Sequence, residues 1–119
     1  MSTYSKLALS GSTHGKSILV AATAIGSGTT IHTASSTTTD GLGDFITLYA
    51  ANGHTATLTL VIGWGGTTDP DDLITQDIPP KAGLVLVVAD LLLRNSLVVK
   101  ASAGTGSKIA IHGYANRIA

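Results

Sequence analysis

Residues 45–64 read FITLYAANGHTATLTLVIGW, two apolar segments on either side of an Asn-Gly pair. Both segments are rich in β-branched and aromatic residues, which favour extended structure. Asn52 and Gly53 suit the positive φ angles of a tight β-turn. The stretch therefore predicts an antiparallel hairpin formed by residues 45–51 and 57–64.

The second of these segments has two different faces, because successive side chains of a strand point to opposite sides. The face predicted to be buried carries Leu58, Leu60, Ile62 and Trp64. The opposite face carries Thr57, Thr59, Val61 and Gly63. Burying four large apolar side chains stabilises a fold by roughly 6–12 kcal/mol, so the leucine face is expected to meet the core.

Short apolar segments separated by Gly, Pro and Asn continue along the chain. Further strands are expected at residues 17–25, 29–34, 73–78, 83–88, 97–101 and 108–116. About eight strands with regularly spaced turns predict an all-β fold, an antiparallel β-sandwich or jelly roll. Residues 1–16 are polar and are expected to form an extended N-terminal arm or a first edge strand, with residues 17–119 as the sandwich domain.

The composition favours a protein that associates with other proteins. Of 119 residues, 44% are hydrophobic and only 12% are charged, which leaves a surface poorly protected against association. The formal net charge is +0 and the basic residues do not cluster, so nucleic-acid binding is not expected. The longest apolar run, residues 83–93, is too short for a membrane span and contains Asp90, so no membrane partner is expected.

Three groups of residues have the chemistry of a ligand site, but each lacks the required spacing. GSTHGKS at residues 11–17 is one residue short of a phosphate-binding P-loop, and the sequence after it is β-branched. The four histidines lack metal-site spacing, and we interpret His32 and His112 as hydrogen-bonded strand residues. The acidic stretch at residues 69–72 is expected to be a solvated loop.

Residue chemistry does not favour catalysis. The chain has no glutamate and no G-x-S-x-G motif, so we expect no enzyme activity, no catalytic residues, no metal and no cofactor. Trp64, Tyr49 and Tyr114 could form a sugar-stacking platform, but Trp64 shares a face with core leucines. We therefore favour packing in the core or in an interface as the interpretation of these aromatic residues.

Residues 44–119 resemble small bacteriophage virion proteins of the β-sandwich type. The resemblance lies in FITLYAANGHTATLTLVIGWG, in ITQDIPPKAGLVLVVADLLLRNSLVVKASAG and in the closing KIAIHGYANRI. It implies a structural virion protein, above all a capsid decoration (cement) protein that forms homotrimers and stabilises the assembled phage head. The implied partners are the major capsid protein or other virion subunits, in virions assembled in the host cytoplasm.

Two other functions remain open at this point: a phage tail, neck or fibre-attachment module, and a carbohydrate-binding β-sandwich. In the virion interpretation, the surfaces left after the core is filled are contacts with other subunits or with the shell. The residues expected there are Tyr4, Leu7, Leu9, Val85, Val87, Leu92 and Tyr114.

Overall fold

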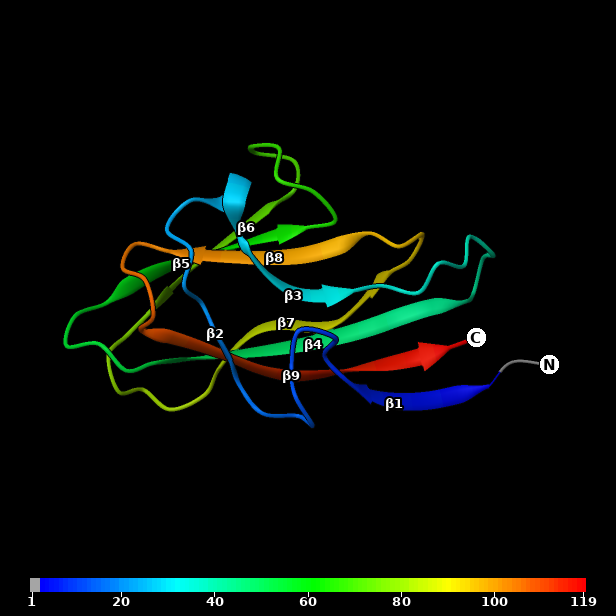
Figure 1. Cartoon of the computed structure of the whole chain (residues 1–119), viewed down its shortest axis with the longest axis horizontal. Helices are drawn as coiled ribbons and strands as arrows, with labels where there is room; N and C mark the ends of the chain where they lie inside the picture. Colours follow the sequence, from blue (N-terminus) through cyan, green and yellow to red (C-terminus); the bar gives the residue numbers. More distant parts are fainter. Residues whose placement is uncertain (1–2) are drawn as a thin grey trace.

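The computed structural model describes residues 3–119, which form two antiparallel β-sheets packed face to face (Figure 1). The predicted all-β sandwich is confirmed. The five-stranded sheet has the order β1-β9-β4-β7, with β2 also paired to β9, and the four-stranded sheet has the order β3-β8-β5-β6. The first comprises β1 (Tyr4–Ala8), β2 (Ile18–Leu19), β4 (Gly43–Asn52), β7 (Val85–Leu93) and β9 (Ile109–Ile118). The second comprises β3 (Thr29–Thr33), β5 (Leu58–Trp64), β6 (Leu73–Ile78) and β8 (Val98–Ala103), and a short 3-10 turn (Ile25–Ser27) precedes β3.

The core lies between the two sheets and is aliphatic. Ile46 and Leu48 of β4 belong to it, as do Leu60 and Ile62 of β5, and all four side chains are fully buried. The alternation predicted for residues 57–64 is confirmed, because Leu58, Leu60 and Ile62 are buried. Thr57 and Thr59 are exposed.

The predicted hairpin of residues 45–51 and 57–64 is wrong. β4 pairs with β7 and β9, whereas β5 pairs with β6 and β8, so the two segments lie in different sheets. Asn52 is buried, and its Nδ2 donates hydrogen bonds to the carbonyl oxygens of Ala56 (3.0 Å) and Ile78 (2.8 Å). Its Oδ1 accepts one from the His54 N–H (2.8 Å). The asparagine thus closes a wide loop between the sheets, and the two apolar faces pack against each other.

Two other strands differ from their predicted extents. The strand expected at residues 17–25 is reduced to Ile18–Leu19, after which Val20 N–H still donates to the Ile109 carbonyl. The strand expected at residues 83–88 continues to Leu93, and its pairing with β4 shifts register twice. These two β-bulges reset the side-chain alternation along β7, so that Val88 is buried although Leu86 is exposed.

Residues 3–16, within the segment expected to be an arm, contact their own chain. β1 pairs with β9 from Tyr4 opposite Ile118 to Ala8 opposite Tyr114. Leu9 is 2% exposed and belongs to the core, and the Gly11 N–H donates to the Ile31 carbonyl. Met1 and Ser2 lie outside the described residues. The part of the segment that the structure describes is therefore an edge strand followed by a loop.

Gly113, in the middle of β9, is expected to tolerate no side chain. Its φ is +157°, and a Cβ atom there would collide with the carbonyl oxygen of Thr47 on the paired strand. Backbone strain and overpacking together should make Gly113→Ala about 2–4 kcal/mol less stable in urea unfolding. Gly104→Ala is the control, because no atom lies within 4 Å of its Cβ position. Equal stability of the two variants would contradict the expected collision.

Candidate functional site

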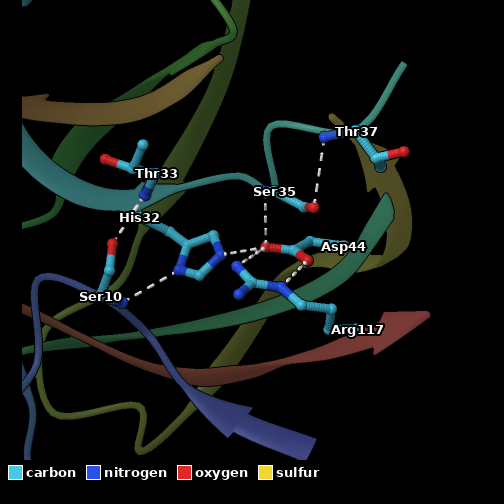
Figure 2. Close-up of polar contacts among 7 residues, drawn as sticks. All are labelled: Ser10, His32, Thr33, Ser35, Thr37, Asp44 and Arg117. Carbon is cyan, nitrogen blue, oxygen red and sulfur yellow. Dashed lines mark hydrogen bonds and ion pairs between the residues drawn. The ribbon is translucent and has the colours of Figure 1, made fainter. Parts of the chain in front are cut away.

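A buried cluster of charged and polar side chains connects the two sheets at one end of the sandwich (Figure 2). Asp44 of β4 lies directly opposite Arg117 of β9 in the five-stranded sheet. His32 comes from β3 of the other sheet. Asp44 is fully buried and His32 is 1% exposed, so the carboxylate is shielded from water on all sides.

Each oxygen of the Asp44 carboxylate accepts hydrogen bonds. Arg117 donates twice, from Nε to Oδ1 (2.7 Å) and from a terminal nitrogen to Oδ2 (2.9 Å). Oδ2 also accepts from His32 Nε2 (2.7 Å) and from the Ser35 backbone N–H (3.2 Å). A bidentate arginine pair of this kind is among the stronger polar contacts in proteins, and it compensates for the loss of water around the carboxylate.

The contacts of His32 determine its tautomer. The Ser10 backbone N–H donates to His32 Nδ1 (2.9 Å), so Nδ1 carries no proton and Nε2–H donates to Asp44. Ser10, His32 and Asp44 have the composition of a Ser-His-Asp triad, but the Ser10 hydroxyl accepts from the Thr33 N–H (2.7 Å) instead of contacting the imidazole. This arrangement is suited to holding the loop against β3 and lacks the serine–imidazole contact of nucleophilic catalysis.

The same contacts change the acidity of both partners of the ion pair. Burial alone raises the pKa of Asp44, but the hydrogen bonds from Arg117 and His32, together with the charge of Arg117, outweigh burial and hold that pKa below its ordinary value. The hydrogen bond to Asp44 raises the pKa of Arg117. Both groups are therefore charged over the whole physiological range.

The outer face of the five-stranded sheet is the second candidate site, and we call it the aromatic face. It consists of the residues that alternate with the core residues in β1, β4, β7 and β9. Phe45 and Tyr49 of β4 alternate with buried Ile46, Leu48 and Ala50. The remaining large side chains of the face are Tyr4, Leu86, Leu92, His112, Tyr114 and Ile118.

The contacts on the aromatic face agree with this assignment. The ammonium group of Lys6 lies 4.4 Å from the centre of the Tyr114 ring, a cation–π contact. The Asp90 N–H donates to the Thr47 hydroxyl (3.2 Å) on the neighbouring strand. A shallow depression of about 280 Å³ is lined by Tyr4, Phe45, Asp90, Asn116 and Ile118. The strands therefore present one continuous surface.

The outer face of the four-stranded sheet has a different character. Thr59 and Asp77 are exposed cross-strand neighbours joined by a hydrogen bond (2.7 Å), and Thr75 is exposed beside them. Lys100 of β8 lies in register with Thr30 of β3. A polar surface of this kind is well hydrated, so the two outer faces of the sandwich are chemically unequal.

The residues expected in an interface are divided between the two sides of the sheet. Tyr4 is 78% exposed and Leu92 40% exposed, and both lie on the aromatic face with Tyr114. Leu9 is buried. Leu7 of β1 points to the inner side of the sheet, as does Ala115, its partner on β9. Val85 and Val87 are half-buried against the core. Whether any of these residues contacts another subunit stays a prediction.

Several residues of the aromatic face were not predicted as a surface. Phe45, Tyr49, Leu86, His112 and Ile118 belong to it. For Phe45, Tyr49, His112 and Ile118, the signal in the sequence was the period-two alternation of residues 45–51 and 110–118, which places these side chains opposite the core residues. Leu86 had no such signal, because the bulges of β7 decide its side. Of the proposed sugar-stacking aromatics, Tyr49 and Tyr114 share this face, whereas Trp64 packs against the core from the other sheet.

The other candidate motifs lie in loops. GSTHGKS forms turns that lead into β2, without the helix that a P-loop requires. In the acidic stretch, Asp72 accepts a hydrogen bond from the Thr68 N–H (3.1 Å). Residues 3–119 contain no group of His, Cys, Asp and Glu side chains placed to hold a metal ion. Nor does any helix within this range have the length and apolar character of a membrane span.

Comparison of the chain with protein-family models, with curated proteins and with solved structures gives no match.

We expect Asp44→Asn to destabilise the fold by about 2–4 kcal/mol, because it removes the anion that pairs with Arg117 and His32 in a buried site. Urea unfolding followed by circular dichroism measures the change. Asp40→Asn is the matched control, since it breaks the Arg94–Asp40 pair (2.8 Å), in which the Asp40 side chain is 99% exposed. This control should leave the unfolding midpoint unchanged. Equal effects of the two substitutions would contradict a structural role for the buried cluster.

Stability should also depend on pH through Asp44. The folded pKa of Asp44 lies below its unfolded value, so the stabilisation is fully present above the unfolded pKa and is lost as pH falls through the folded pKa. We expect the free energy of unfolding to decrease as pH falls below about 4, and Asp44→Asn to lack this part of the decrease. A decrease of the same size in wild type and Asp44→Asn would assign the acid sensitivity to other groups.

Proposed function

We propose that the protein is a structural subunit of a larger assembly and that its aromatic face is buried there against other proteins. The observation that carries the proposal is the position of the aromatic residues. All three tyrosines and the single phenylalanine of the chain belong to the aromatic face, and the core between the sheets is aliphatic. Aromatic side chains contribute strongly to protein interfaces because each buries a large area.

The character of the rest of the face supports the same proposal. Leu86 and Leu92 lie at its edge and are 50% and 40% exposed. The largest apolar patch of a monomer, usually roughly 300–600 Å², is often its functional surface. The opposite outer face, with its threonines and charged residues, has the composition of a surface that remains in water. The unequal faces fit a subunit with one contacted side.

We propose further that the assembly is a bacteriophage particle and that the protein is a capsid decoration (cement) protein. This part rests on the sequence resemblance of residues 44–119. Binding to the assembled shell of major capsid protein, but not to its separate subunits, would add the binding free energy to the stability of the particle. Localisation in the virion and the absence of enzyme activity belong to this proposal.

A tail, neck or fibre-attachment module would use the same surface, and the copy number distinguishes the two positions. Quantitative mass spectrometry of purified particles should find hundreds of copies for a head protein and a few to dozens for a tail component. Complete absence of the chain from particles would contradict both.

Carbohydrate binding is the second candidate, favoured by one observation. Tyr49 and Tyr114 lie on adjacent strands of the same face, where Tyr49 pairs with His112 and Tyr114 pairs with Thr47. Sugar rings stack on aromatic platforms of this kind. A glycan array tests this alternative. Glycan binding by the wild type that is lost in Tyr114→Ala would replace the assembly proposal.

For the assembly proposal, we expect Leu86→Ser to weaken co-sedimentation with assembled phage shells by at least about tenfold. Loss of a leucine contact of about 1.5–3 kcal/mol predicts this size of effect. Leu97→Ser is the matched control, because Leu97 is 41% exposed and lies in the loop after β7, away from the aromatic face. Equal weakening by both substitutions would contradict the role of the face, and a wild-type chain that does not sediment with shells would contradict the virion assignment.

A further inference from the structure

We propose that the partner on the aromatic face is a second copy of this chain, related to the first by a two-fold axis parallel to the strands of the five-stranded sheet. The inference rests on the proposed function, because it takes the aromatic face as a buried contact and names what covers it. Four features carry it: the charges on the face, their register, the area of the face and the shape of its edge.

The charged side chains on the aromatic face are complementary to those of a second copy. Among the outward-pointing residues of β1, β4, β7 and β9, Lys6 and Asp90 are the charged ones. They have opposite signs and lie on opposite edge strands, Lys6 on β1 and Asp90 on β7. A self-complementary contact requires this arrangement, because each copy then supplies both members of the pair.

The register of the strands determines which symmetry brings these charges together. Lys6 is in register with Asn116, which is opposite Phe45, so Lys6 and Phe45 lie at the same level along the strands. Asp90 bonds to Thr47 and therefore lies about 7 Å further along, two residues of a strand. A two-fold axis parallel to the strands places β1 of one copy over β7 of the other. Lys6 of each copy then comes within side-chain reach of Asp90 of the other.

A two-fold axis across the strands gives a different result. It places β1 of one copy over β1 of the other, so that neither Lys6 has an acidic partner. The axis parallel to the strands also places Tyr4, the most exposed large side chain of the face, over the β7 side of the partner.

The area of the face is sufficient for a specific contact. β4, β7 and β9 have nine or ten residues each and β1 has five. At about 3.3 Å per residue and about 4.8 Å between strands, they cover roughly 540 Å² in each copy. The total of roughly 1,100 Å² is above the roughly 1,000 Å² that a specific contact requires and just below the standard size, and protruding side chains increase it. A second copy is thus large enough to cover the strands of the face.

The shape of the β7 edge favours contact through the face over contact through the edge. β7 contains two bulges and has Asp90 at a φ of +55°, which interrupt the row of backbone groups available for strand addition. A three-fold ring that joins the β1 edge of one copy to the β7 edge of the next would depend on this interrupted edge. We therefore place a two-fold dimer where the sequence resemblance implies a trimer.

The test is sedimentation equilibrium of the full chain from about 1 to 100 µM, the range that resolves contacts of moderate affinity. The wild type should have twice the monomer mass of 12.0 kDa. Lys6→Asp and Asp90→Lys each place like charges together and should each raise the dissociation constant at least tenfold. The double variant restores opposite charges and should return to within about threefold of wild type.

Two further variants control for effects on folding. Asp90→Asn removes the charge but keeps a residue type that tolerates a positive φ, so it should weaken the dimer without straining the bulge. Asp77→Lys changes a charge on the polar outer face of the other sheet and should leave the dimer intact. Circular dichroism at a concentration where all variants are monomeric verifies that each is folded.

The outcomes separate this inference from the proposed function. A wild type that is monomeric or trimeric, or a dimer unaffected by the charge changes, would overturn the two-fold contact. If such a protein still sedimented with phage shells and lost this in Leu86→Ser, the proposed function would stand without the dimer. A charge-dependent dimer that does not bind shells would support the inference and contradict the virion assignment.

Discussion

The arrangement of this sandwich depends on the contacts of the buried Asp44 carboxylate. It lies in the five-stranded sheet, where Arg117 of the neighbouring strand neutralises it, and it accepts a hydrogen bond from His32 in the opposite sheet. His32 in turn accepts the Ser10 N–H, which ties the loop after β1 to β3. Apolar packing holds the sheets together without specifying one alignment, whereas a buried charge has few positions in which all its partners are satisfied. We therefore infer that the cluster helps to fix how the two sheets align.

The distribution of side-chain types follows from a division between the two sides of the five-stranded sheet. Its inner side carries isoleucine, leucine and alanine, which fit the narrow space between sheets. Its outer side carries the larger rings, Phe45, Tyr49 and Tyr114, which a thin core has little room to accommodate. A monomer gains little from rings that remain in contact with water. Another surface that removed them from water would add to their stabilisation, and for this reason their position supports the proposed association.

Period-two alternation was enough to predict the sandwich and the buried face of residues 58–62, because it depends only on neighbouring residues. The pairing of strands was not predictable in this way, and Asn52-Gly53 shows why. A tight turn is the usual role of this dipeptide, but the Asn52 side chain donates hydrogen bonds to the carbonyl groups of Ala56 and Ile78, and the chain crosses to the other sheet.

The Asp44 cluster was missed for a related reason. His32 lies 12 residues and Arg117 73 residues from Asp44 along the chain, and no local spacing indicates that these residues meet. The bulges of β7 likewise depend on the partner strand, so the outward side of Leu86 could not be derived from alternation alone.

The cluster and the aromatic face occupy the same stretch of the same strands, and this proximity would connect stability with the proposed association. Asp44 points inward next to Phe45, which points outward, and Arg117 points inward between Asn116 and Ile118 on the outer side. The backbone that presents Phe45 and Ile118 is therefore held from behind by a bidentate ion pair. A surface fixed in this way loses little conformational entropy when a partner binds, so more of the gain from burying its rings is retained as binding free energy. A charged cluster in the interior can thus contribute to association without touching the partner.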